Sequence, residues 1–549
     1  MASQTRFTAL IRIAGSTYKF TDRVTEELFT AELITDGERV TLLVEPKAPV
    51  SFEELAVICK ESIGDDDRLF LNGYQSWTDS REWSTKETQR GIDRIPSPLV
   101  KKYNFDKYGD YNFTHYHTTP GVLHGFTYGY IRTGSEYRLY GSLSERCGFT
   151  KVTIHSSKQR VKLSRECEGA VYAEPFNAVD AAVLTGTESE VFDRWFSLMG
   201  IAPSQANPLT GYTSWYRHYQ DISEEKLLHD LDAIVASGRK LDIFQIDDGY
   251  QTGVGDWLNI DESKFPNGLR PVCDKIHAEG MLAGLWLAPF VCEANSRLYR
   301  EHADWLMRDE NGAPLPAGCN WSGSYALDIY NEEVREYLRE VFTYYLDECG
   351  FDLVKLDFLY AACILPANGK SRGEIMADGM DFLRECVGDR LILGCGVPLG
   401  SAFGKVEYCR IGCDVGLSWN DNLVMQMTHR ERVSTKNSML NTVFRRQLNG
   451  RAFLNDPDVF LLRDESISLK QCQKMSLAVI NHLFGSVFFT SDDVSTYNES
   501  QQRLERIAKR MVGAAVHSAE LTGGILTLSL TENGTDRTIR LDTSDGRLF

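Results

Sequence analysis

From Leu209 to about residue 493, short apolar stretches alternate with longer segments of helical periodicity, and this alternation constrains the fold more than any other feature. A short apolar run followed by a helix is typical of a parallel sheet, because parallel neighbours need a long crossover connection. We count eight such stretches, at 211–216, 241–248, 280–289, 352–358, 391–396, 408–414, 451–456 and 486–493. Eight strand–helix repeats over about 300 residues predict a closed (β/α)8 TIM barrel. A doubly wound sheet is the alternative, but no GxGxxG or Walker loop accompanies the strands.

Segments rich in β-forming residues lie on both sides of this region. Before residue 205, stretches of alternating, β-branched or aromatic residues are separated by Gly, Ser and Asp, as in RVTLLVEP, GFTYGYIRTG and YRLYGSLS. They predict an N-terminal β-sandwich. After residue 516 the strand pattern returns, with Asn533-Gly534 as a hairpin turn. We therefore expect a multidomain α/β protein with a β-sandwich at 1–205, a barrel at 206–515 and a small C-terminal β domain at 516–549.

The amino-acid composition limits which binding partners and which cellular compartment we expect. The 549 residues carry 59 Lys and Arg against 77 Asp and Glu, a formal net charge of −18. This balance argues against nucleic acid and anionic membrane surfaces, which need a basic face. The thirteen cysteines contain no C-x-x-C pair, and the N-terminus has no signal-peptide pattern. The longest apolar run, 281–291, is too short to span a bilayer. We expect a soluble, cytoplasmic protein with reduced thiols.

Charged residues gather where the predicted strands end. In a barrel the loops at the carboxyl ends of the strands form the site. The second, fourth and sixth strands end in Asp247-Asp248, in Lys355-Leu356-Asp357 and in Arg410-Ile411-Gly412-Cys413-Asp414. Taken singly, the first motif also suits a turn or a helix cap, and the other two suit structural ion pairs. Their joint position in one barrel favours a functional site.

Side-chain alternation predicts which of these residues face inward. Lys355 and Asp357 share one face of their strand, and Phe358 is then expected on the other face, toward the helices. Arg410, Gly412 and Asp414 share a face in the same way. Ionised groups that point into a barrel are costly unless they are paired, so we expect them to serve a purpose.

Two carboxylates that face each other beside cations suit glycoside hydrolysis. A retaining glycosidase uses one carboxylate as nucleophile and a second as acid and then base, at a separation of roughly 5–5.5 Å. Lys355 beside Asp357 would keep that carboxylate ionised, as a nucleophile requires. Asp414 would begin protonated, favoured by the charge of Asp357 and partly opposed by Arg410. Asp247 and Asp248 suit sugar hydroxyls, and Trp286 offers a flat face to a pyranose ring.

Seven motifs in order resemble the α-galactosidases of glycoside hydrolase family 36, with family 27 as a more distant relative. They are FQIDDGYQ (244–251), KFPNGL (264–269), GLWLAP (284–289), KLD (355–357), GCG (394–396), CRIGCD (409–414) and NDPD (455–458). The resemblance covers nearly the whole chain and implies the same order of sandwich, barrel and small β domain. It implies no metal and no cofactor.

The resemblance also implies individual roles. Asp357 is then the nucleophile and Asp414 the acid/base, and Asp247 and Asp248 bind the 4- and 6-hydroxyls of an axial-4-OH sugar. Lys355 and Arg410 bind hydroxyls around C2 and C3, and Trp286 lies against the ring. Trp77 of the sandwich reaches over the barrel mouth, and Cys395 matches a pocket cysteine, although a buried small side chain is an equal reading of it.

Two loops depart from the family pattern, namely 394–404 after the fifth strand and SWYRHY (214–219) after the first. Both are expected to line the pocket, and Gly396 and Gly400 would leave room for a 2-acetamido group. The predicted function is a retaining α-galactosidase acting on terminal α-galactosides of oligosaccharides or glycoconjugates, with an α-N-acetylgalactosaminidase as the alternative.

Two other classes of protein stay open at this stage. A metal-dependent barrel lyase or isomerase would hold Mg²⁺ on the strand-end carboxylates, although no His cluster accompanies them. A non-catalytic sugar-binding protein would need neither Asp357 nor Asp414. The β domains beside the barrel are compatible with a homo-oligomer.

Overall fold

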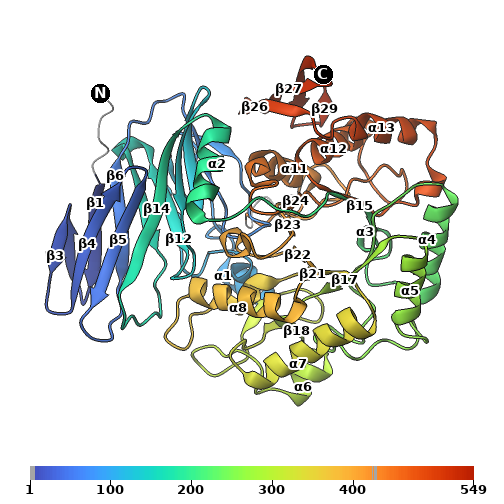
Figure 1. Cartoon of the computed structure of the whole chain (residues 1–549), viewed down its shortest axis with the longest axis horizontal. Helices are drawn as coiled ribbons and strands as arrows, with labels where there is room; N and C mark the ends of the chain where they lie inside the picture. The colour runs from blue at the N-terminus through green and yellow to red at the C-terminus, as the bar shows by residue number, and fades with distance from the viewer. Residues whose placement is uncertain (1–6, 423–424, 426–429) are drawn as a thin grey trace.

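The computed structural model describes residues 7–422, 425 and 430–549. An antiparallel sandwich lies beside a barrel, and a small antiparallel sheet packs against the last helices of the chain (Figure 1). The predicted fold class is therefore confirmed. Among the described residues, no helix has the length and apolar character needed to cross a membrane.

The N-terminal sandwich consists of two antiparallel sheets. The first, in spatial order, is β2 (Ser16–Phe20), β1 (Phe7–Ile13), β6 (Glu54–Lys60), β13 (Arg160–Arg165), β12 (Thr150–His155) and β9 (Val122–Phe126). The second is β3 (Arg23–Thr25), β4 (Phe29–Asp36), β5 (Arg39–Pro46), β14 (Phe176–Gly186), β11 (Glu136–Ser142), β10 (Tyr128–Thr133), β7 (Arg68–Leu71) and β8 (Glu82–Ser84). Alternate residues of β5, Val40, Leu42 and Val44, are fully buried, which is how a two-period apolar pattern builds a sandwich core.

All eight predicted barrel strands form, in parallel and in chain order. They are β15 (Leu209–Thr213), β16 (Ile243–Ile246), β17 (Leu282–Leu287), β21 (Leu353–Leu356), β22 (Leu391–Gly394), β23 (Tyr408–Arg410), β24 (Leu454–Asp456) and β25 (Val487–Thr490). The sheet closes between its last two strands, where the Ser486 amide donates to the Asn455 carbonyl at 2.9 Å and Val459 bridges Phe489. This closure rules out the doubly wound alternative.

Helices surround the barrel, and most of the longer ones begin at a Ser or Asn N-cap whose side chain accepts a backbone amide. The longer ones are α4 (Glu224–Ala236), α5 (Arg270–Ala278), α7 (Glu332–Thr343), α8 (Arg372–Val387), α11 (Thr435–Phe444), α12 (Gln471–Phe484) and α13 (Glu499–Lys509). In α7 the buried residues Val334, Leu338, Val341 and Phe342 recur at helical spacing. The N-cap Ser371 begins α8 with a capping box to Glu374.

The C-terminal sheet consists of β26 (Ala515–Thr522), β27 (Ile525–Glu532), β28 (Thr535–Asp542) and β29 (Arg547–Leu548). The predicted hairpin is confirmed, because Glu532 pairs with Thr535 across Asn533 and Gly534. Both turn residues have positive φ, 49° and 77°, as a two-residue hairpin of this kind requires. The indole of Trp419 ties the sheet to the barrel by donating to the Thr543 carbonyl at 3.0 Å.

The sandwich contacts the carboxyl ends of the barrel strands through its own loop after β7. Arg445, fully buried just after α11, donates to the Ser76 and Gln75 carbonyls of this loop and to the Ile411 carbonyl after β23. One guanidinium thus fixes the loop that carries Trp77 against the end of a barrel strand.

A second contact comes from the segment between β8 and β9. It contains α1 (Ser97–Tyr103), and its Tyr108 hydroxyl accepts the Cys319 amide at 2.7 Å. Cys319 follows β19 (Pro316–Gly318), which belongs to a three-stranded sheet with β20 (Ser324–Ala326) and β18 (Val291–Glu293).

Candidate active site

A cavity of about 300 Å³ opens at the carboxyl ends of the barrel strands. Its polar lining comes mainly from strand ends, namely Thr213, Gln245, Asp247, Asp248, Lys355, Asp357, Arg410, Asp414, Asp456 and Asp458. Its aromatic lining includes Trp286 of β17 and, from the sandwich, Trp77, Phe105 and Tyr108. Eight of the nine side chains singled out from the sequence line this cavity, and the exception is Cys395.

Asp357 lies directly after β21 and is 7% exposed. Its Oδ1 accepts the Phe358 amide at 2.9 Å, and its Oδ2 accepts the Trp286 indole at 3.1 Å. Two donors therefore fix the carboxylate while it faces the cavity.

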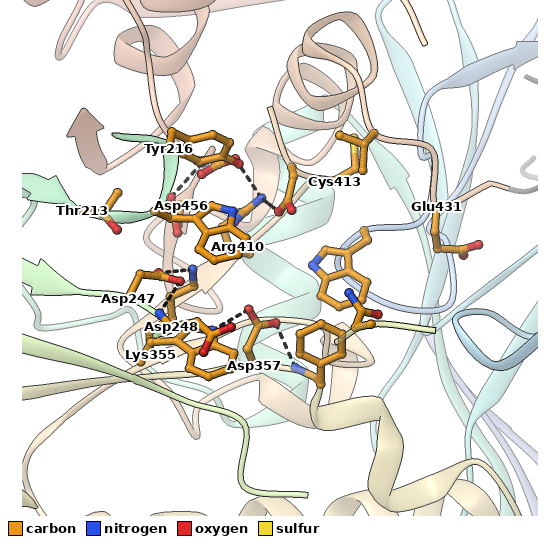
Figure 2. A pocket seen from close by; sticks show the side chains of 18 of the residues that line it. Thr213, Tyr216, Asp247, Asp248, Lys355, Asp357, Arg410, Cys413, Glu431 and Asp456 are labelled. Carbon is orange, nitrogen blue, oxygen red and sulfur yellow. Dashed lines mark hydrogen bonds and ion pairs between the residues drawn. The ribbon is translucent and has the colours of Figure 1, made fainter. Parts of the chain in front are cut away.

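The nearest charge partner of Lys355 is Asp247 rather than the expected Asp357. The Lys355 ammonium lies 2.9 Å from Asp247 Oδ2, and Figure 2 shows this pair beside Asp357. Burial lowers the pKa of Lys355, but Asp247 and, after it, Asp357 raise it well above the usual value. Lys355 thus stays protonated and belongs to an alternating row of two carboxylates and one ammonium.

Asp248 is 2% exposed and lies behind Asp247 at the end of β16. Its carboxylate accepts Gln251 Nε2 at 2.6 Å, Trp321 Nε1 at 2.8 Å and Gln220 Nε2 at 2.8 Å. Burial raises the pKa of Asp248, and the Gln251 and Trp321 donors oppose that change. Asp248 therefore links the cavity to the loops after β15 and β19.

Arg410 and Asp414 form the predicted pair on the opposite side of the cavity. The guanidinium lies 2.9 Å from Asp414 Oδ1 and 3.1 Å from Asp458 Oδ2. Arg410 is 3% exposed at its side chain, whereas the Asp414 side chain is 44% exposed. Because β23 ends at Arg410, Asp414 is carried by a loop. The expected alternation of side chains between two faces therefore stops at Arg410. A side chain at Gly412 would contact Asn441 of α11 rather than point into the cavity.

Trp77 lines the cavity, as predicted, and it covers Cys395. Its indole donates to Cys395 Sγ at 3.4 Å, and the thiol is 1% exposed. The prediction of a pocket cysteine at 395 is therefore not supported by its placement, because the chain beyond β22 turns this side chain beneath the tryptophan. Cys413 and Cys319 line the cavity instead.

The expected space near two glycines is filled. A methyl group at Gly396 would lie 2.9 Å from the Trp77 ring, and one at Gly400 would lie 2.5 Å from Thr127 Oγ1, away from the cavity. Residues 394–404, all of which the structure describes, contribute nothing to the lining, so the prediction for that loop is wrong. The prediction for the loop after the first strand is confirmed, because Trp215 and Tyr216 line the cavity.

Several lining residues were not singled out from the sequence. Asp456 and Asp458 lie in the quoted NDPD motif, and the strand-end rule would have found Asp456. Phe358 was expected to face the helices, but its backbone turns to φ 54° and its ring enters the cavity lining. Trp321, with φ 55°, lies in a loop where no periodic pattern identifies it.

Part of the barrel region is similar in sequence to known proteins. Residues 204–369 match the Melibiase family model. Over 151 residues the chain is 33% identical to alpha-galactosidase Mel36A of Lactobacillus acidophilus, an alignment that covers 26% of this chain and 20% of that protein. The sequence match to this curated relative thus spans about a fifth of the relative's length.

Two solved structures share the fold over nearly the whole chain. The alpha-galactosidase TtGalA of Thermus thermophilus superposes with a TM-score of 0.69 at 24% identity, covering 96% of this chain and 98% of that one. The GH36 alpha-galactosidase AgaA of Geobacillus stearothermophilus gives 0.63 at 12% identity, covering 98% and 81%. The sequence match to the Melibiase family model lies within the barrel region, and the fold match to these α-galactosidase structures extends over nearly the whole chain.

Proposed function

We propose that the chain is a retaining α-galactosidase that removes terminal α-linked galactose from oligosaccharides or glycoconjugates. The observation that carries the proposal is the pair Asp357 and Asp414, which line the same cavity. Asp357 is buried and held by donors, whereas Asp414 reaches solvent beside a cation. A buried carboxylate held in one orientation suits a nucleophile, and the exposure of Asp414 allows the proton exchange with water that an acid/base needs.

The reaction then proceeds in two displacements. Asp414 gives its proton to the glycosidic oxygen while an Asp357 oxygen attacks C1, so that the C1–O bond to the leaving group breaks and a glycosyl ester forms. Asp414, now a carboxylate, takes a proton from water, whose oxygen attacks C1 and releases Asp357. Two inversions at C1 return galactose with its original α configuration.

The remaining lining residues would bind the sugar. Asp247 and Asp248 are acceptors for the 4- and 6-hydroxyls, and Lys355 and Arg410 are donors toward C2 and C3. Trp286, whose indole already holds Asp357, offers its ring to the apolar face of the pyranose. Trp77 closes the mouth from the sandwich side.

Cavity size and the related proteins support a terminal sugar as the substrate. A cavity of about 300 Å³ lies at the small end of ligand sites and suits one pyranose with the first atoms of its leaving group. Structures of TtGalA hold p-nitrophenyl alpha-D-galactopyranoside and stachyose, and one of AgaA holds raffinose. The alternative α-N-acetylgalactosaminidase loses its main argument, because Trp77 and Thr127 fill the spaces beside Gly396 and Gly400.

A panel of aryl α-glycosides tests the function directly. We expect release from the α-galactoside, with α-galactose as the first product seen by proton NMR before mutarotation. A β-configured first product would overturn the retaining mechanism, and turnover of the 2-acetamido sugar alone would overturn the substrate.

A further inference from the structure

Asp458 lies behind Arg410 and contacts three separate parts of the candidate site. Its Oδ2 accepts the Val415 amide at 2.8 Å and the Tyr216 hydroxyl, and it lies 3.1 Å from Arg410. Val415 is the residue after Asp414, and Tyr216 belongs to α3 (Trp215–His218). One buried carboxylate therefore joins the first strand's loop, the sixth strand and the loop that carries Asp414.

The backbone of Asp458 is held in a conformation that its side-chain type rarely adopts. Its φ is 72°, and its amide donates to Asp456 Oδ1 at 2.8 Å. Its carbonyl accepts Asn481 Nδ2 of α12 at 3.3 Å. A left-handed aspartate costs of order 1 kcal/mol or more, so its neighbours must impose the conformation. A strained backbone conformation in the wall of a cavity is typical of functional residues.

We propose that Asp458 is a positioning residue that controls when Asp414 holds its proton, by sharing Arg410 with it and by fixing the adjacent Val415 amide. This inference rests on the proposed function, in which Asp414 is the acid/base. It concerns a residue that itself needs no contact with the sugar.

The physical reason is a division of one positive charge between two carboxylates. If Asp458 were neutral, the whole charge of Arg410 would act on Asp414 and favour its carboxylate form. The proton needed for the first displacement would then be lost at a lower pH. With Asp458 ionised, the charge of Arg410 is partly balanced, so Asp414 keeps its proton to a higher pH. When Asp414 gives that proton to the leaving group, Arg410 stabilises the new carboxylate.

Other charged and titratable groups lie around this pair. They are Asp456 after β24, Tyr216 and Tyr219 at α3, Lys355 and Asp357 of β21, Cys395 after β22 and Cys413 in the Asp414 loop. Burial raises the pKa of Asp458 to about 6 against the opposing effect of Arg410. Asp458 is therefore ionised at neutral pH, where the sharing operates.

Asp458→Asn tests the inference through the pH profile of kcat/KM. With phenyl α-galactoside, which needs protonation of its leaving group, we expect the basic limb to move to lower pH by ~0.5–1 unit. The rate loss near pH 7 should be larger with the phenyl substrate than with a 2,4-dinitrophenyl substrate, which needs little acid assistance. Asp458→Glu keeps the charge and should restore the position of the limb.

The matched control is Asp492→Asn. Asp492 is also buried, lies after the neighbouring strand β25 and is paired with an arginine, Arg463, at 3.3 Å, but it does not line the cavity. This variant should lose stability without moving the limb. If Asp458→Asn does not fold, Tyr216→Phe removes a donor that favours the charged form of Asp458 and should move the limb in the same direction by less.

The outcomes distinguish a failure of the role of Asp458 from a failure of the proposed function. A limb that superposes on that of the wild type, or that moves to higher pH, would overturn the role of Asp458 while galactoside turnover persists. A wild-type chain that releases galactose from neither aryl substrate would instead overturn the proposed function.

Discussion

The two sides of the cavity are built in different ways. The barrel side, which we define as Asp247, Lys355 and Asp357, consists of side chains on or directly after strands β16 and β21, and its two carboxylates are buried. The loop side, which we define as Asp414, Val415 and Glu431, lies beyond the end of β23, and the Asp414 side chain is 44% exposed. Figure 2 shows Asp357 and Lys355 on one side and Arg410 with Tyr216 on the other. A carboxylate that must stay aligned suits a strand end, whereas one that must exchange protons with water suits an open loop.

The charges on the two sides are also balanced differently. On the barrel side, Lys355 pairs with Asp247 within the barrel itself. On the loop side, Asp414 depends on Arg410, and Glu431 is held by the sandwich, through Thr78 at 2.7 Å and Tyr111 at 2.5 Å. The barrel side is thus complete within one domain, whereas the loop side needs two. Substitutions should therefore have different consequences on the two sides.

The largest effect is expected on the barrel side, from Asp357→Gly. Removing the proposed nucleophile should lower kcat by about 10⁴-fold or more, whatever the leaving group. Added azide can enter the vacated space and attack C1 opposite the leaving group, so it should restore turnover and give β-galactosyl azide. The azide product is identified by NMR. An α-configured azide would contradict the assignment of the nucleophile.

A smaller and selective effect is expected on the loop side, from Asp414→Gly. Loss of the proposed acid/base should slow hydrolysis of a phenyl galactoside by roughly 10²–10⁴-fold. A dinitrophenyl galactoside should still form the glycosyl ester, because its leaving group departs without a proton. Azide would then displace Asp357 from the opposite face and give α-galactosyl azide. Equal losses with both substrates would mean that Asp414 does not act as the acid.

The barrel side was also the part that the sequence predicted best. Asp247, Lys355 and Asp357 follow apolar strands directly, and strand alternation fixes where such residues point. The eight strands and the Asn533-Gly534 hairpin were predicted for the same reason, since their signals are local. Prediction failed one or two residues beyond a strand, where Cys395 is placed beneath Trp77 and where the backbone of Phe358 turns to φ 54°.

The loop side depends on contacts between residues far apart in the sequence. Asp458 reaches Tyr216 and Val415 only after the barrel closes, and no spacing in the sequence indicates those contacts. Arg445 likewise meets the sandwich loop across about 370 positions, as its hydrogen bond to the Gln75 carbonyl shows. Such residues carry no periodic signal, so strand and helix patterns alone could not identify them.

The smallest expected effect concerns how the sandwich holds the loop side at different pH. Burial raises the pKa of Glu431 to about 7 from a usual value of 4.5, against its hydrogen bonds from Tyr111 and Thr78. A raised pKa means that folding favours the protonated form, so this stability is complete below about pH 4.5 and is lost as the pH rises through 7. Glu431→Gln should remove that loss, worth up to ~3 kcal/mol, and gain a few °C in apparent Tm over wild type between pH 5 and 8. The exposed Glu225→Gln of α4 is the control, and a Glu431→Gln gain that does not change with pH would show that the carboxyl group is not the cause.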